Sequence, residues 1–554
     1  MNVPWVRFFW TVRYLRPIQI WGRLLFKWRR PAPELAPPPP LRTVQGSWIK
    51  PTSRRASMLG PKRFCFLNRT ADLDSSEGWN DSSADTLYLY NLHYFDDLNA
   101  VDASGRTDWH HALIERWISE NPPAEGVGWD PYPLSMRIVN WIKWAQSGNR
   151  LSSAALHSLA IQARFLARRL EFHLLGNHLF ANAKALVFAG CFFAGDEAAV
   201  WRQRGMSILS REIPEQLLAD GGHFERSTMY HSLALEDMLD LENLLKAFPD
   251  AFDKWSEEAA QWPALAGKMT QWLAAMCHPD GEISFFNDAA TGIAPSPEEL
   301  FRYADRLRIG QQSQMTNGVV WLKASGYIRV QVGDAVLIAD VAPIGPDYLP
   351  AHAHADSLSF ELSVGGKRLI VNSGTSRYGL GKQREYERST AAHSTLEIDK
   401  ESSSEVWAGF RVGRRAYPVD LAVEESISEV RISAAHNGYR RLPGHPLHRR
   451  QWTLGNRSLV VSDSIEGDYS CAVARYFLHP DAEIGTDLGR DCAILGDIQC
   501  RWTSAGANLG IAASRYFPEF GLDVPSSCIE LNAAERAIVF HLSWRETSAE
   551  ELSH

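Results

Sequence analysis

The sequence predicts a multidomain α+β protein, in which a helical domain is followed by an antiparallel β domain. From about Tyr88 to Leu307, apolar residues recur every three or four positions, as in PLSMRIVNWIKWA and HSLALEDMLDLENLLKAF. From about Gly318 onward the period changes to two, and Gly-Asp, Gly-Gly and Gly-Asn turns separate the alternating segments. Because the helices precede the strands rather than alternate with them, the pattern argues against a doubly wound nucleotide-binding fold.

The first 84 residues precede these two domains and divide into three parts. Residues 1–30 form a basic, aromatic and amphipathic segment that Pro17 interrupts. Two interpretations fit this segment: a helix that contacts a membrane surface or a partner, or a helix that packs on the main body with its arginines in water. Residues 31–40, PAPELAPPPP, are typical of a stiff polyproline II spacer. Residues 41–84 are mixed in composition and indicate no domain.

The helical domain is predicted over residues 85–313. Turn signals such as LLGNH, ADGGHFERS and HPDGEISFFND separate its helices, and the connecting loops are short. Antiparallel helix pairs joined in this way form a bundle, a solenoid or a ring. The β domain is predicted over residues 314–554 as an antiparallel sandwich, and the break between the domains falls in the short polar stretch GQQSQMTNG.

Length, charge and composition restrict the class of protein. A chain of 554 residues is too long for one hydrophobic core. Its net charge of −8 argues against nucleic acid as a partner, and a polyanionic substrate would need a local positive patch. The seven cysteines include no CxxC pair, so neither a disulfide framework nor a zinc–thiolate site is indicated. The 20 tryptophans fit either sugar stacking or a large helical core.

The N-terminus shows no export signal. No uninterrupted apolar run reaches the roughly 18 residues of a membrane span. A signal peptide needs an uncharged central run, and Arg7, Arg13, Arg16 and Arg23 interrupt the apolar N-terminal segment. We therefore expect a cytoplasmic or inner-membrane-associated protein, with a periplasmic location left open and with peripheral membrane contact through the N-terminus as one interpretation.

Asn177 and His178 begin a predicted helix in the stretch LLGNHLFANAKAL. A helix N-terminus offers free N–H groups and a field that favours an anion, so Asn177 is a candidate to hold a carboxylate. The alternative is that Asn177 is a helix N-cap and nothing more.

The stretch DGGHFERSTMYHSLALED places His223, Glu225, Arg226, Tyr230 and His231 within nine positions after a Gly-Gly turn. Such a density of reactive side chains at one helix start indicates a cleft, where active sites concentrate. A capped helix with solvated charges is the alternative.

The stretch AHAHADSLSF sets His352 and His354 two residues apart, followed by Asp356. Side chains alternate along an extended segment, so the two imidazoles lie on one side, which suits proton transfer or metal ligation. Two ligands alone do not make a metal site. Asp356 is expected to orient a nearby imidazole or to cap the turn.

The stretch REYERSTAAHSTLEID supplies Arg384 and Arg388, and His393 just before a predicted strand. In an acidic protein, two neighbouring arginines suit a substrate carboxylate or sulfate. The alternative for each arginine is a surface salt bridge.

An ordered set of motifs between about residues 85 and 455 resembles the heparinase II/III family of polysaccharide lyases. The matching pieces are WDPYPLSMRIVNWI, GNHLFANAKALVFAG, DGGHFERSTMYH, HPDGEISFFND, HAHADSLSFELSVGGKRLIVNSGTSRY, ERSTAAHSTLEID and EVWAGFR. The resemblance implies an N-terminal incomplete (α/α) toroid and a C-terminal antiparallel β-sandwich. It also implies cleavage at C4 of a uronic acid by β-elimination. Residues 1–84 lie outside the matched set.

The resemblance implies a role for each matched residue. Asn177 would neutralise the substrate carboxylate, with His178 adjacent to it. Tyr230 would be base, acid or both, depending on the epimer bound, and His352 would be the partner base. His223 and Arg226 would lie in the cleft. A phenol whose pKa is lowered by neighbouring cations serves both proton transfers.

The resemblance also raises the question of zinc, because some members of the family carry a structural zinc ion. By pattern its ligands would be His354, residue 372 and His393. The family commonly has Asp at that middle position, whereas this chain has Asn372, and a neutral amide is the poorer zinc ligand. The alternative is a hydrogen-bonded His–Asn–His cluster. We expect no cofactor to be required.

Three hypotheses of function follow from the sequence. The leading one is a lyase that acts on an acidic, uronic-acid-containing polysaccharide, within a bacterial pathway that builds an exopolysaccharide. The second is a uronate C5-epimerase, which removes the same proton and returns it from the other face. The third is a carbohydrate-binding or assembly protein with a degraded site, and the intact set of Asn177, Tyr230 and His352 argues against it.

Overall fold

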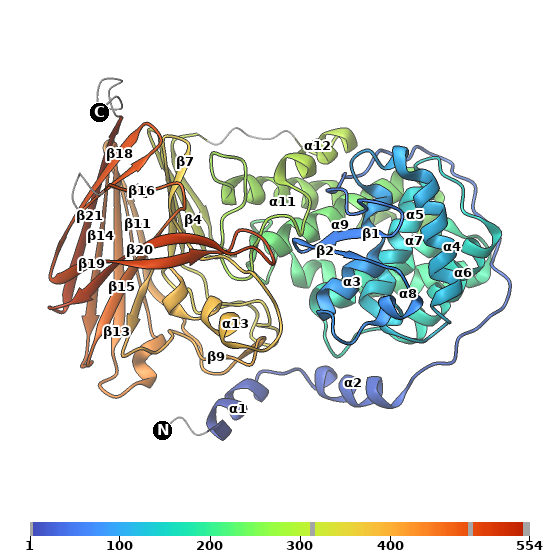
Figure 1. Cartoon of the computed structure of the whole chain (residues 1–554), viewed down its shortest axis with the longest axis horizontal. Helices are drawn as coiled ribbons and strands as arrows, with labels where there is room; N and C mark the ends of the chain where they lie inside the picture. Colours follow the sequence, from blue (N-terminus) through green and yellow to red (C-terminus); the bar gives the residue numbers. More distant parts are fainter. Residues whose placement is uncertain (1–3, 311–315, 486–490, 547–554) are drawn as a thin grey trace.

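A helical domain and a β domain lie side by side along the long axis of the molecule (Figure 1). The computed structural model describes residues 4–310, 316–485 and 491–546. The predicted boundary between residues 313 and 314 lies outside the described residues. The last helix of the helical domain, α12 (Pro297–Leu307), ends before that gap, and strand β3 (Gly318–Leu322) begins after it.

The helical domain is an incomplete (α/α) toroid, as the resemblance implies. Its longer helices are α3 (Thr86–Tyr94), α4 (Thr107–Glu120), α5 (Pro131–Gln146), α6 (Ser153–Arg168), α7 (Gly176–Phe192), α8 (Asp196–Gln216), α9 (Thr228–Ala247), α11 (Trp262–Met276) and α12. Their starts carry the expected signals, since Asp85, Ser152, Ser227 and Ser296 cap helices and Pro131 opens α5. None of the described helices is both long and apolar enough to cross a membrane.

The tryptophans are mostly core residues. Trp117, Trp141, Trp144, Trp262 and Trp272 are buried within the helical domain or where it meets the β domain. Their large apolar surfaces stabilise the packed helices through the area that they remove from water. The high tryptophan content is therefore explained largely by the core rather than by sugar contacts.

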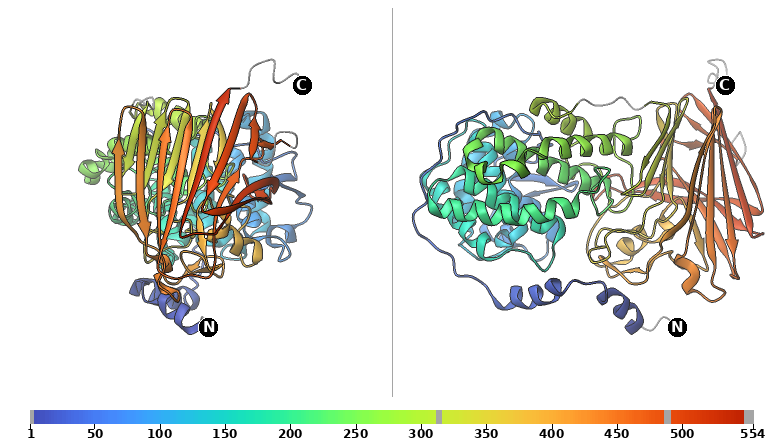
Figure 2. Two further views of the ribbon diagram at one scale, coloured as in Figure 1. Left: turned by 90° about the vertical axis from the view of Figure 1, so that its left-hand side faces the viewer. Right: turned by 180° about the vertical axis from the view of Figure 1, so that it is seen from behind.

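The N-terminal segment runs beneath both domains before it joins the toroid (Figures 1 and 2). It contains helices α1 (Pro4–Val12) and α2 (Pro17–Trp28), with Pro17 at the first position of α2. The chain then passes along the outside of the helical domain to a hairpin of β1 (Arg63–Phe66) and β2 (Arg69–Asp72).

The β domain is a sandwich of two antiparallel sheets. One sheet has the order β19 (Ala507–Tyr516), β20 (Val524–Ala533), β15 (Ala472–Leu478), β7 (Lys367–Val371), β6 (Phe360–Val364), β5 (Ala335–Asp340), β4 (Tyr327–Val332) and β3, with β8 (Leu396–Ile398) also paired to β15. The other has the order β11 (Pro418–Glu425), β12 (Glu429–His436), β13 (Leu447–Gly455), β14 (Ser458–Glu466), β21 (Ala537–Glu546), β18 (Ile498–Ala505), β17 (Cys492–Leu495) and β16 (Glu483–Ile484).

The packing of the sheets decides where the domains meet. Phe360, Trp452 and Phe540 belong to the core between the two sheets. Strands β5 and β6 are buried along their whole length, because the second face of this sheet packs on the helical domain. At that contact Ile338 of β5 joins Trp272 of α11 in one apolar cluster. The loops that leave this sheet are thereby held against the helix starts of the toroid.

Candidate active site

A cleft of about 690 Å³ lies where the helical domain, the β domain and the N-terminal helices meet. The residues that line it include Gln19 and Arg23 of α2, Asn177 and Tyr230 of the toroid, and His352 and Tyr378 of the β domain. Its aromatic lining consists of tyrosines and phenylalanines, with no tryptophan among the described lining residues. Four of the residues singled out in the sequence, Asn177, His178, Tyr230 and His352, therefore line one cleft.

Asn177 is presented by an unusual helix start. The N-cap of α7 is Leu175, which has a positive φ of 61°, and Gly176 follows with a φ of 53°. Asn177 is thus the second residue of the helix rather than its N-cap. Its amide lines the cleft at the positive end of α7. Beside it, Nδ1 of His178 lies 3.2 Å from Oε1 of Glu171.

Tyr230 lies in the first turn of α9, where the Ser227 hydroxyl accepts a hydrogen bond from its backbone N–H. Its phenol oxygen lies 3.0 Å from that of Tyr378, and its ring stacks on His352 with centroids 3.9 Å apart. Burial, with Tyr378 and Asp288 adding to it, raises the pKa of Tyr230 well above its usual value. The expectation that cations lower this pKa is therefore wrong, and the resting side chain is a neutral phenol that can donate a proton.

His352 is held by a buried carboxylate. Its Nδ1 lies 2.9 Å from Oδ2 of Asp288. Burial alone would raise the pKa of Asp288, but Arg384 and the hydrogen bonds from His352 and His354 hold it well below the usual value. An ionised carboxylate only accepts hydrogen bonds, so Nδ1 of His352 carries the proton and Nε2 is the free nitrogen. Burial lowers the pKa of His352, against the opposing effect of Asp288, so the ring is neutral and can accept a proton.

Asp288 was missed in the sequence, where Asn287-Asp288 is interpreted as a turn. Asp356, the carboxylate expected to orient an imidazole or cap the turn, instead accepts a hydrogen bond from the backbone N–H of Asn287 at 3.0 Å. The orienting carboxylate is Asp288, which comes from the loop between α11 and α12. No local signal identifies it, because its partners are 64 and 96 positions further along the chain.

The three residues considered as zinc ligands, His354, Asn372 and His393, contact one another or the backbone. Nδ1 of His354 lies 3.1 Å from Nε2 of His393. The Asn372 side chain is occupied by the backbone, since its amide donates to the Phe285 carbonyl at 2.9 Å and its oxygen accepts from the Ser394 N–H at 3.0 Å. No cluster of three His, Cys, Asp or Glu residues suited to a metal occurs in the described part of the chain. The donor set does not fit a three-ligand zinc site.

The predicted substrate-binding arginines do not reach the cleft. Arg384 is buried and makes a two-pronged contact with Asp288, with Nη2 at 2.7 Å from Oδ2. Arg388 is buried too and donates to the Ala353 carbonyl at 2.9 and 3.0 Å; burial lowers its pKa to about 9. Arg226 donates to the Ser325 carbonyl at 2.9 Å, across the contact between the domains. None of these three arginines lines the cleft or forms a salt bridge on the surface. Each instead fixes the position of a neighbouring residue around the site.

His223 lies behind the cleft, in the wall of a small adjoining cavity of about 30 Å³ that Asn177 and Tyr230 also line. Its Nε2 lies 3.2 Å from the side-chain oxygen of Gln216. Burial lowers its pKa to about 3, so the ring is neutral. A cavity of this size holds about one water molecule, not a sugar.

Glu225 is a second residue that the sequence does not single out for a role. It is buried on the cleft wall, and neither carboxyl oxygen has a hydrogen-bond partner among the described residues. Its Oε2 lies 3.9 Å from Nε2 of His352. Burial, together with the charge of Asp288, raises its pKa to about 8.

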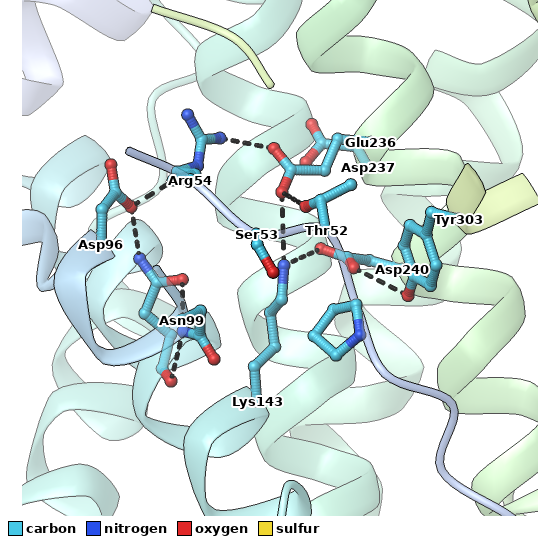
Figure 3. Close-up of polar contacts among 12 residues, drawn as sticks. Thr52, Ser53, Arg54, Asp96, Asn99, Lys143, Glu236, Asp237, Asp240 and Tyr303 are labelled. Carbon is cyan, nitrogen blue, oxygen red and sulfur yellow. Dashed lines mark hydrogen bonds and ion pairs between the residues drawn. The ribbon is translucent and has the colours of Figure 1, made fainter. Parts of the chain in front are cut away.

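Paired charges line the small cavity, and Figure 3 shows those that involve Arg54, Lys143, Glu236 and Asp240. Arg54 contacts Glu236, and Nζ of Lys143 lies 3.0 Å from Oδ2 of Asp240 and 3.3 Å from Oε1 of Glu236. Nζ of Lys184 lies 2.7 Å from both Asp237 and Asp240. Every cation in this network therefore has a carboxylate partner.

Comparisons with known proteins identify related chains for both domains. The family model described as Heparinase II/III N-terminus matches residues 94–303, and the one described as Heparinase II/III-like, C-terminal matches residues 314–545. A solved structure of heparinase III is 19% identical with a TM-score of 0.68, and the match covers 85% of this chain and 80% of that one. At this identity the likeness of structure shows the fold.

Three relatives extend the comparison. A heparin-sulfate lyase of Bacteroides stercoris is 26% identical over 330 residues, which are 56% of this chain and 46% of the relative. A heparin-sulfate lyase of Pedobacter heparinus is 27% identical over 41% of this chain and 36% of the relative. The matched regions thus span less than half of these two proteins. FtsZ-localized protein C of Caulobacter vibrioides is 24% identical over 85% of this chain and 84% of the relative.

Proposed function

The chain belongs to the heparinase II/III family, and from this premise we propose that it is a polysaccharide lyase that cleaves a uronic-acid-containing polymer by β-elimination. The observation that carries the proposal is the convergence of Asn177, Tyr230 and His352 on one cleft, with His352 held by Asp288. These groups meet the three needs of the reaction: a partner for the carboxylate, a base for the C5 proton and an acid for the leaving oxygen.

The protonation states favour one division of labour. Nε2 of neutral His352 takes the C5 proton, and the electrons of that bond move toward the carboxylate carbon. The C4–O4 bond then breaks, and the neutral phenol of Tyr230 gives its proton to O4. Asn177 stabilises the charge that develops on the carboxylate. Tyr378, at 3.0 Å, can donate to the phenolate that Tyr230 leaves behind.

The charge balance of the cleft favours carboxylated polymers without sulfate. A bound sulfate needs a cation whose hydrogen bonds are free. Arg54 in the cleft wall is paired with a carboxylate, and Nη1 of Arg415 lies 2.6 Å from Asp347. In the adjoining small cavity, Lys143 and Lys184 are paired with carboxylates too. Among the described arginines that line the cleft, Arg23 and Arg411 make no ion pair. Both are exposed to solvent, so the described residues in the buried part of the cleft offer a sulfate no unpaired arginine.

One assay tests this proposal against its alternatives. Purified protein is incubated in D₂O with a panel of unsulfated and sulfated uronate polymers, and near-ultraviolet absorbance and deuterium at C5 are followed. New absorbance from an unsaturated uronate identifies a lyase. Deuterium at C5 without absorbance identifies a C5-epimerase. Neither signal, with binding retained, identifies a carbohydrate-binding or assembly protein and refutes both enzymatic functions.

We further propose that the protein acts at the inner face of a bacterial membrane, in a pathway that builds an exopolysaccharide. Support comes from the N-terminal helices, where Trp5, Trp21 and Trp28 are 77%, 66% and 80% exposed. Basic residues accompany them, including Arg23 and Lys27. Exposed aromatic and basic side chains on one amphipathic segment suit the surface of an anionic bilayer.

A further inference from the structure

The carboxyl group of Glu225 lies between His352, the proposed base, and the start of α7, which carries Asn177. The Glu225 side chain is buried, yet its residue lines the cleft and neither of its oxygens has a hydrogen-bond partner in the described part of the chain. Oε2 lies 3.9 Å from the free Nε2 of His352. Oε1 lies beside Gly176, because a Cβ on Gly176 would meet it at 3.0 Å. Gly176 directly precedes Asn177, so one carboxyl oxygen lies toward the base and the other toward the start of α7.

The surroundings of this carboxyl favour its neutral form. The titratable groups on the elements packed around it are His352, Asp288, Tyr230, Tyr378 and, at the start of α7, His178. None of them donates a hydrogen bond to it. Burial and, to a smaller degree, the charge of Asp288 together raise the pKa of Glu225 to about 8. Near pH 7 the group is therefore a carboxylic acid with one O–H to donate.

We propose that Glu225 donates a hydrogen bond, as a neutral carboxylic acid, to the carboxylate of the bound uronate and so acts together with Asn177 as the binding site for that group. This inference rests on the proposed function. When C5 approaches Nε2 of His352 at about 3–3.5 Å, the distance of a reacting pair, the carboxylate carbon attached to C5 comes within reach of a donor 3.9 Å from the same nitrogen.

The hydrogen bond strengthens during the reaction. As the C5–H bond breaks, its electron pair moves into the C5–C6 bond and a second negative charge develops on the carboxylate oxygens. A carboxylic acid poised beside them stabilises that charge, as a protonated carboxyl does in other enzymes that form enolates. The pair then expels O4, which takes its proton from Tyr230. His352 holds the C5 proton, and Glu225 keeps its own proton throughout.

The first test compares Glu225→Gln with Glu225→Ala. Gln keeps an N–H donor of similar shape, so we expect kcat/KM within about tenfold of wild type at pH 7, whereas loss of the donor in Ala lowers it about 10²–10³-fold. The wild-type rate should fall above pH 8 as Glu225 ionises, and this alkaline limb should be absent in Glu225→Gln. Equal loss in both variants, wild-type activity in Glu225→Ala, or an unchanged alkaline limb would overturn the proposal.

The second test does not depend on turnover. In a Tyr230→Phe background, the affinity for the member of the uronate panel that binds most tightly at pH 6 is measured by calorimetry up to pH 9. We expect the affinity to fall at least tenfold above pH 8, and to stay level when Glu225→Gln is added. A level profile in both proteins refutes the role of Glu225. If the affinity falls as expected but wild type gives neither absorbance nor deuterium exchange, the lyase function is refuted and the binding role of Glu225 is retained. If no polymer binds, both proposals are refuted.

Discussion

Oδ2 of Asp288 lies 2.9 Å from Nδ1 of His352, so a carboxylate from the helical domain fixes the proton of an imidazole from the β domain. The same carboxylate is bound by Arg384 and lies 2.8 Å from Nε2 of His354. Each domain therefore contributes one member of the Asp288–His352 pair, so the proposed base depends on the contact between the domains.

Asp288→Asn should inactivate the enzyme while leaving the shape of the site nearly unchanged. An amide can donate to Nδ1 and so favours the wrong tautomer of His352. We expect kcat to fall by about 10³–10⁴-fold, as for other carboxylate–imidazole pairs. The matched control is Asp356→Asn, which alters another buried carboxylate that accepts from a backbone N–H rather than from His352. Equal loss in both variants, measured by the absorbance assay, would contradict the role given to Asp288.

Tyr230→Phe and Tyr378→Phe should separate the proton donor from its neighbour. Loss of the Tyr230 hydroxyl removes the acid, so turnover should fall below detection while circular dichroism stays native. Loss of the Tyr378 hydroxyl removes only a hydrogen bond to Tyr230, which is worth about 0.5–1.5 kcal/mol, so kcat should fall about tenfold or less. A Tyr378 variant that is as inactive as the Tyr230 variant would assign the acid to Tyr378 instead.

Glu225 should also make the free energy of unfolding depend on pH. Its folded pKa of about 8 lies above the ordinary 4.5, so the folded state binds this proton more tightly than the unfolded state. The stability from this group is complete below pH 4.5 and is lost as the pH rises through 8, with a slope of about 1.4 kcal/mol per pH unit at most. In urea titrations, wild type should therefore lose more stability than Glu225→Gln between pH 5 and 8. Parallel curves would show that Glu225 ionises normally.

Metal chelation should leave the enzyme unchanged, because Asn372 directs both side-chain atoms to the backbone. After treatment with EDTA and desalting, we expect the same melting temperature and kcat, and less than one zinc per ten chains by elemental analysis. Asn372→Asp removes the N–H donor to the Phe285 carbonyl and should destabilise the protein by about 1–3 kcal/mol. Stoichiometric zinc in the wild-type protein would contradict this account.

The N-terminal helices should bind anionic vesicles. We expect wild-type protein to sediment with vesicles that contain phosphatidylglycerol, to sediment less with phosphatidylcholine alone, and to be released by salt, because exposed basic and apolar side chains act together. Trp21→Glu with Leu25→Glu should abolish the binding without affecting turnover of a soluble substrate. Val200→Glu is the control, since this exposed apolar residue lies on α8, away from these helices. Equal binding by all three proteins would refute membrane contact through these helices, and absence of binding by wild type would refute membrane contact altogether.

The architecture could be predicted because its signals are local. The change from a period of three to four to a period of two marks the two domains, and polar caps and prolines mark the helix starts. Asn177, Tyr230 and His352 could be found because each lies in a motif that resembles one family. The long-range contacts of these residues and the shifts in their pKa could not be predicted in the same way.

The long-range contacts explain the errors. Arg384 binds Asp288, a residue 96 positions earlier, instead of substrate. The sequence near Arg384 gives no sign of that contact. The pKa of Tyr230 rises because Tyr378 and the β domain bury it, which the pattern of α9 cannot reveal. Glu225 is likewise defined by its lack of partners, a property that exists only in the folded chain.

The N-terminal helices contact both domains at once. The amide of Gln19 donates to the Tyr348 carbonyl at 3.0 Å, Nε1 of Trp407 donates to the Thr11 hydroxyl at 3.1 Å, and Arg16 lies 2.5 Å from Glu215 of the toroid. Because Gln19 and Arg23 also line the cleft, part of its wall is formed by residues that precede both family domains. A change confined to these helices would therefore alter the wall of the cleft while leaving Asn177, Tyr230 and His352 untouched.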